Sequence, residues 1–124
     1  MALPGRGRDP LLPREPRFAP GDPRPATVYY DPEVWPHVRD GIEELALIAR
    51  EAGRPLFHLA LRWLTDSGTI ASVLVGSRNR DHLAGNLAAF EGSMDPSAMR
   101  RLDEASRRIN RHIPRVGNIF KHYP

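Results

Sequence analysis

The stretch Ser72-Val-Leu-Val-Gly-Ser-Arg-Asn-Arg-Asp-His-Leu-Ala-Gly-Asn86 carries more information about the fold than any other part of the chain. An apolar, β-branched run ends at Gly76, a polar turn follows, and Leu83, Leu87 and Phe90 then recur at helical spacing. A strand, a glycine turn and a helix N-terminus together form an arrangement that binds anions through free backbone N–H groups and the helix dipole. The stretch therefore indicates a phosphate or nucleotide site, and a purely structural turn is the alternative.

The residues around this stretch predict four helices and one strand. Helical periodicity predicts helices over residues 36–53, 55–67, 80–90 and 95–108, with Gly53 ending the first and Asp95 capping the last. In the second helix, the expected buried stripe is Leu56, Leu59, Ala60 and Trp63. Residues 70–75 are consecutively apolar, as in a parallel strand that is buried on both faces.

Proline divides the chain into two parts. Nine of the thirteen prolines precede His37, a density that neither a helix nor a central strand tolerates. Residues 1–36 are therefore expected to be loop-like or disordered, and residues 37–124 to hold the folded part. Aromatic side chains in residues 29–36 predict that this loop packs against the rest.

The amino-acid composition of the chain excludes several classes of protein. The chain has 124 residues, no cysteine and a formal net charge of +3. Disulfides and thiolate metal sites are excluded, and no apolar run approaches the roughly 20 residues that span a bilayer. Its start lacks the apolar core of a signal peptide, so a cytoplasmic protein is expected. His37, His58 and His112 show no metal-ligand spacing, and no metal site is predicted.

Five sequence motifs, taken in chain order, resemble the C-terminal part of proteins of the aldo/keto reductase family. They are Ile42-Glu-Glu-Leu-Ala-Leu-Ile-Ala-Arg-Glu-Ala-Gly53, Leu59-Ala-Leu-Arg-Trp-Leu64, Ser72-Val-Leu-Val-Gly-Ser-Arg-Asn79, His82-Leu-Ala-Gly-Asn86 and Asp95-Pro-Ser-Ala-Met-Arg-Arg-Leu-Asp103. The resemblance implies an α/β fold, the C-terminal portion of a (β/α)8 TIM barrel that is mostly helical with one clear parallel-type strand. Such barrels need about 250 residues, so we expect a fragment.

The resemblance also implies a cofactor, NADP, and a small carbonyl substrate for the full-length family. Matching the family's motif position by position gives the residues expected to hold the adenosine 2′-phosphate and adenine: Gly76, Ser77, Arg78, Asn79, His82 and Asn86. Two positions depart from the family pattern, because His82 stands where Arg or Gln is usual and Gly85 replaces the usual Glu.

The family's catalytic Tyr, Lys, Asp and His are not expected in this chain. Its tyrosines are Tyr29, Tyr30 and Tyr123, its lysine is Lys121, and none of them lies in the family's catalytic context. The chain alone is therefore expected to be inactive. Trp35, Phe120 and Tyr123 are expected either to line a substrate pocket in a complete enzyme or to anchor the chain against the barrel.

A second hypothesis is a small basic helical module that contacts nucleic acid or a protein partner. Residues 55–65 and 80–90, with the arginine-rich C-terminus, would then mimic a helix-turn-helix. That motif needs a turn of about three or four residues, whereas an apolar run separates these two helices. Nucleic acid is therefore not an expected partner. A membrane is not expected either, because no apolar run is long enough to span a bilayer.

Overall fold

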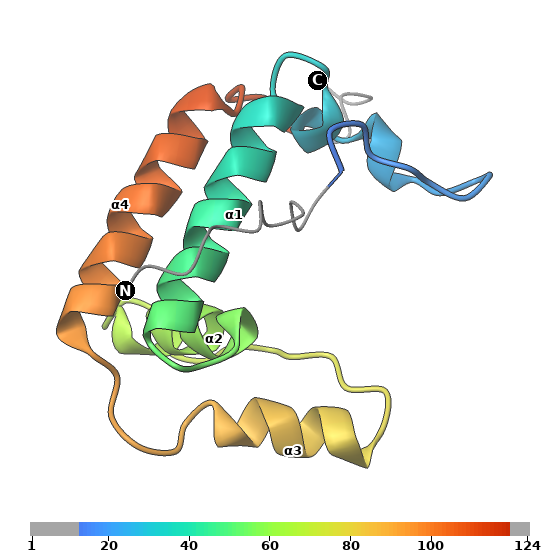
Figure 1. Cartoon of the computed structure of the whole chain (residues 1–124). Helices are drawn as coiled ribbons and strands as arrows, with labels where there is room; N and C mark the ends of the chain where they lie inside the picture. The colour runs from blue at the N-terminus through green and yellow to red at the C-terminus, as the bar shows by residue number, and fades with distance from the viewer. Residues whose placement is uncertain (1–12, 120–124) are drawn as a thin grey trace, which may run out of the picture. The chain divides into compact units, whose positions relative to one another are not determined.

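The computed structural model describes residues 13–119, which form four α-helices and two short 3-10 turns (Figure 1). The helices are α1 (Trp35–Glu51), α2 (Leu56–Asp66), α3 (Arg80–Ala88) and α4 (Pro96–His112), preceded by η1 (Arg24–Ala26) and η2 (Val28–Tyr30). The chain divides into two compact units. Among the described residues, one unit comprises 13–43 with 109–119, and the other comprises 44–108.

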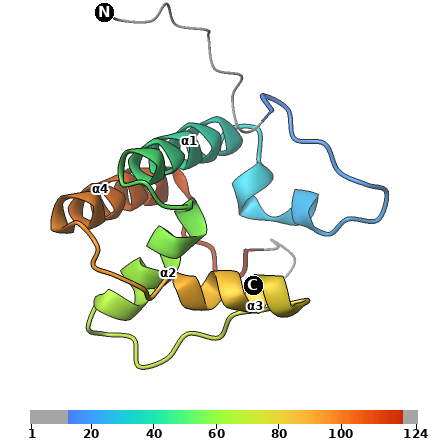
Figure 2. The same ribbon diagram turned by 60° about the horizontal axis from the view of Figure 1, so that its bottom comes forward.

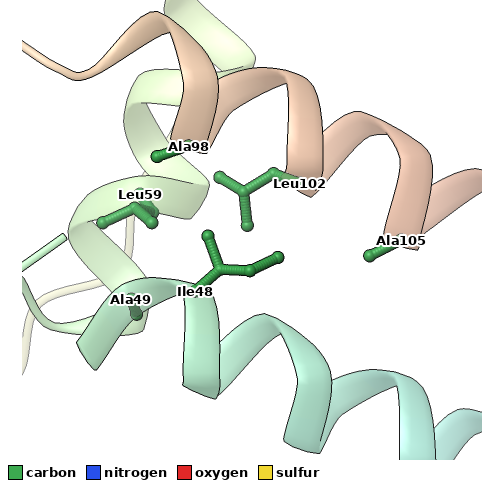
Figure 3. Close-up of a cluster of buried hydrophobic side chains, with 6 residues drawn as sticks. All are labelled: Ile48, Ala49, Leu59, Ala98, Leu102 and Ala105. Carbon is green, nitrogen blue, oxygen red and sulfur yellow. The ribbon is translucent and has the colours of Figure 1, made fainter. Parts of the chain in front are cut away.

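The unit of residues 44–108 is built around one apolar cluster, to which α1, α2 and α4 all contribute (Figure 3). Ile48 and Leu59 are almost completely buried, and Leu102 of α4 points toward them. Small residues at the remaining positions let the helix backbones approach closely; they are Ala49, Ala98 and Ala105. Helical spacing of apolar residues along α1 and α4 thus explains why these faces are buried.

The other unit is centred on Trp35, at the start of α1. Its indole packs with Val34 and Val38, stacks on Tyr30 at 4.9 Å between ring centroids, and donates a hydrogen bond from Nε1 to the carbonyl oxygen of Arg14 at 3.0 Å. The proline-rich segment is therefore tied to α1 by both apolar and polar contacts. This confirms that the aromatic residues before α1 pack against the folded part.

A close helix approach in the same unit depends on Gly41. A Cβ atom at this position would clash with the side chain of Ile109 in α4. Glycine therefore lets α1 pass close to Ile109 despite the cost of placing it inside a helix, about 1 kcal/mol relative to alanine.

The predicted helices are present, with some differences at their ends and faces. α1 ends before Gly53, which has a left-handed backbone (φ 68°), as predicted. Asp95 caps α4 by accepting a hydrogen bond from the backbone N–H of Ser97 at 2.9 Å, and α4 continues to His112 rather than Arg108. In α2, Leu61 is buried and Ala60 is exposed, opposite to the predicted stripe.

The predicted parallel strand is absent, so the α/β description is wrong for residues 13–119. This part of the chain contains no strand, and residues 70–75 form an irregular linker between α2 and α3 (Figure 2). Leu74, expected in a buried sheet, is 99% exposed. The physical reason is that strand structure needs a neighbour to accept and donate ladder hydrogen bonds, and no second extended segment pairs with this one in the described chain.

Candidate functional site

The start of α3 is fixed by Asn79. Its backbone is extended (φ −154°, ψ 176°), and its side-chain oxygen accepts a hydrogen bond from the backbone N–H of His82 at 2.9 Å. The N–H of Leu83 bonds to the Asn79 carbonyl oxygen at 3.2 Å. This is the ordinary N-cap arrangement, which satisfies one of the orphan donors of the first turn. Asn79 therefore has a structural role in addition to the predicted binding role.

Two predicted site residues, nine positions apart, meet at this helix. The amide nitrogen of Asn86 donates to the hydroxyl oxygen of Ser77 at 3.0 Å. An asparagine amide has two donors and one acceptor, so this bond leaves one N–H and the carbonyl oxygen available for another group. The Ser77 hydroxyl accepts this bond and retains its own hydrogen for donation. The contact closes the turn onto α3 while leaving donors open.

The remaining predicted residues are open to solvent. An added Cβ at Gly76 would meet no atom within 4 Å, so packing within the described residues does not require glycine there. The exposed side chain of Arg78 forms no ion pair with any residue that the structure describes. Arg80 and Asp81 open the helix, and the two arginines outnumber the single carboxylate there. The local electrostatic balance therefore favours an anion.

The C-terminal end of α3 is held by hydrogen bonds from residues that the sequence analysis did not single out. Arg62 donates to the carbonyl oxygens of Ala89 and Gly92 at 3.3 and 3.1 Å, and Arg54 reaches Ala89 at 3.3 Å. A His58 ring nitrogen lies 3.0 Å from the carbonyl oxygen of Gly85. Cations at a helix C-terminus complement its partial negative charge. No local sequence pattern announces these contacts, because their partners lie 27–35 residues away.

These bonds matter because α3 buries no side chain of its own. Leu83, Leu87 and Phe90 are 51%, 62% and 48% exposed. The helix is therefore positioned by its cap, by the Ser77–Asn86 bond and by the bonds from Arg54, His58 and Arg62, rather than by a buried apolar face. A turn held in this way presents Arg78 and the helix N-terminus at the surface.

The residues expected at a substrate pocket are found elsewhere or lie outside the described chain. Trp35 is 6% exposed in the core of its own unit, which favours the anchoring alternative for this side chain. Phe120, Tyr123 and Lys121 fall outside residues 13–119. Within the described helices, none is long and apolar enough to cross a membrane.

A sequence model of the aldo/keto reductase family matches residues 6–107. The chain belongs to the aldo/keto reductase family. The match confirms the resemblance carried by the five motifs, and it extends that resemblance from Ile42 back through the proline-rich segment. No curated protein and no solved structure matches the chain.

Family membership places the Gly76 turn in an oxidoreductase family that generally uses NAD(P)H. In (β/α)8 enzymes, phosphate sites are frequently built from the loops after the last two strands and a helix N-terminus. The turn from Gly76 to Asn79 followed by α3 has the local form of such a site. No strand precedes the turn within residues 13–119, so this described part contributes the loop and the helix.

Proposed function

We propose that residues 76–86 hold the adenosine 2′-phosphate and adenine of NADP in an aldo/keto reductase. Gly76 would let the backbone approach the nucleotide, Ser77 would donate its hydroxyl, and Arg78 would pair with the 2′-phosphate. Asn86 would contact adenine. Asn79 would support the turn, and His82 would lie beside it in the first turn of α3.

The observation that carries this proposal is the Ser77–Asn86 hydrogen bond. It brings a residue of the expected phosphate turn and the expected adenine-contacting residue together while each keeps hydrogen-bonding capacity. The exposed Arg78 guanidinium supports it, because its planar donor fork matches a phosphate. The open space at Gly76 also supports it, since this is where a ligand would otherwise meet a side chain.

The chain acts on a carbonyl, in this proposal, only when a complete barrel supplies the other half of the cofactor pocket and the catalytic residues. When bound, NADPH supplies the hydride, and the family's Tyr, Lys, Asp and His handle the proton. This chain's part is to bind and orient the adenosine end. By itself it is then a nucleotide-binding segment without turnover.

Isothermal titration with two matched nucleotides tests the 2′-phosphate site. Adenosine 2′,5′-bisphosphate is expected to bind more tightly than 5′-AMP, which differs only by the 2′-phosphate. Replacing Arg78 by alanine removes a charge-assisted contact of about 1.5–3 kcal/mol, so affinity for the bisphosphate should fall by about 10- to 150-fold. The control is Arg100→Ala, an exposed arginine on α4, which should leave both affinities unchanged.

Equal binding of the two nucleotides, or equal effects of Arg78→Ala and Arg100→Ala, would overturn the proposed site. Inactivity is tested separately, by a carbonyl reduction assay with NADPH. Turnover comparable to that of full-length reductases would contradict the absence of a catalytic set. The alternative helix-turn-helix gains no support, since α2 ends at Asp66 and α3 begins only at Arg80.

A further inference from the structure

α2 and α3 meet at the last turn of α3, within the unit of residues 44–108 (Figures 1 and 2). The ring nitrogen Nε2 of His58 lies 3.0 Å from the carbonyl oxygen of Gly85. The Phe57 ring lies beside the same residue, because a Cβ atom added at Gly85 would come within 3.6 Å of it. The Phe57 and His58 rings pack edge to face at 4.4 Å between centroids. α2 thus contacts this turn through one polar and one apolar side chain.

The Gly85 carbonyl group lies at the end of the helix, where donors within the helix run out. The last four carbonyl groups of an α-helix have no partner inside it. In a continuing α-helix the N–H of Ala89 would bond to the Gly85 oxygen, but here it bonds to the carbonyl oxygen of Asn86 at 3.3 Å. His58 therefore replaces the missing donor. A carbonyl oxygen can only accept, so Nε2 of His58 carries the hydrogen.

The bond from His58 fixes the point from which the Asn86 side chain starts. The Gly85 carbonyl group and the Asn86 N–H belong to one planar peptide unit, which ends at the Cα atom of Asn86. Because His58 holds the oxygen of this unit, it restricts rotation of the whole plane. The Asn86 amide in turn donates to the Ser77 hydroxyl at 3.0 Å. A continuous path of contacts therefore runs from α2, through one peptide unit, to the turn before α3.

We propose that His58 is a positioning residue for the adenosine site. Its Nε2–H group orients the Gly85–Asn86 peptide unit and thereby sets the Asn86 amide for contact with adenine. The inference rests on the proposed function of residues 76–86. It assigns His58 to the adenine half of that site, whereas Arg78 belongs to the 2′-phosphate half. His58 acts through Asn86 and does not touch the nucleotide.

This division between the two halves gives a specific pattern of affinities. Loss of one intramolecular hydrogen bond corresponds to about a 2- to 12-fold change in an equilibrium. His58→Leu should therefore weaken binding of adenosine 2′,5′-bisphosphate and of 5′-AMP by the same factor, within this range, and leave their ratio unchanged. Arg78→Ala should instead reduce the ratio. His58→Gln keeps an N–H donor on a side chain of similar reach, so it should restore both affinities.

Isothermal titration of the full chain and its variants measures these affinities. Arg62→Gln is the matched control, because Arg62 also bonds from α2 to this end of α3, at the carbonyl oxygen of Ala89. Its bond does not reach the Gly85–Asn86 peptide unit, so both affinities should stay unchanged. The NMR signal of the Asn86 side-chain amide is the second readout: it should shift in His58→Leu and stay in place in Arg62→Gln.

Nitrogen NMR of the His58 ring in the unmodified chain tests the contact without a substitution. A neutral ring with its only hydrogen on Nδ1 would overturn the inference. Full affinity in His58→Leu, an equal loss in Arg62→Gln, or a loss confined to the bisphosphate would overturn it as well. Equal binding of the two nucleotides by the unmodified chain would overturn the proposed function, and this inference with it.

Discussion

Replacing Asn79 by alanine should loosen α3 selectively. Asn79 caps this helix through one hydrogen bond of 2.9 Å to the backbone N–H of His82. Loss of such a cap costs about 1 kcal/mol. α1 and α4 are held in place by buried apolar faces, whereas α3 buries no side chain. The loss should therefore appear as local opening of α3 rather than as unfolding of the whole unit.

Amide hydrogen exchange measures this opening directly. A free energy of 1 kcal/mol corresponds to about a fivefold change in a local equilibrium, so protected amides of α3 should exchange about five times faster in Asn79→Ala. Amides of α4 should not change. Asn79→Asp, which keeps an acceptor of equal capping strength, is the matched control. Unchanged exchange in α3 of the alanine variant would refute the conclusion that the cap positions this helix.

The same variants separate helix formation from ligand contact. If the nucleotide binds the ordered N-terminus of α3, Asn79→Ala should weaken binding by no more than the fivefold expected from helix opening. Arg78→Ala should weaken binding more strongly and leave exchange unchanged, because its guanidinium has no ion-pair partner in the described residues. Faster exchange in Arg78→Ala would contradict this division of roles.

Three further predictions concern stability and titration. Leu102→Ala should lower the free energy of unfolding by about 2–5 kcal/mol in urea denaturation, because Leu102 is 5% exposed in the core. Gly41→Ala should cost about 1–3 kcal/mol in the same assay, since the new methyl group meets Ile109. Hydrogen bonds from Arg24 hold the pKa of the Asp22 carboxyl below its ordinary value. The stability that this pair contributes is therefore present above the ordinary pKa of an aspartate and is lost as the pH falls through the lowered pKa. An NMR titration midpoint of Asp22 that Arg24→Gln leaves unchanged would contradict this.

Most of the helical structure was predictable from the sequence, because its determinants are local. Gly53 and Asp95 mark helix ends through their own backbone preferences and hydrogen-bonding groups, and both act as expected. The stripe of α2 was partly wrong: Leu61 is buried and Ala60 exposed. Periodicity gives the spacing of a buried face, but the neighbours that bury it come from α1 and α4.

Residues 70–75 show why the predicted strand is absent from the described structure. Consecutive β-branched residues describe how a chain behaves inside a sheet, where both faces are covered and every backbone group is paired. Those conditions are supplied by other strands, and residues 13–119 supply none. The same residues therefore form an exposed linker, and the prediction of a strand is wrong for the described residues.

The candidate site forms without a sheet because its hydrogen bonds join residues that are close together in the sequence. Asn79 reaches His82 three positions on, and Ser77 reaches Asn86 nine positions on, so both contacts form once α3 is helical. A strand instead needs a partner from a distant part of a chain or from another chain. The turn is thus separable from a sheet, and under the proposed function the nucleotide contacts at Arg78 would form on this chain without a barrel. Hydride transfer, in the same proposal, would also need groups beyond this turn to hold the nicotinamide end against a carbonyl.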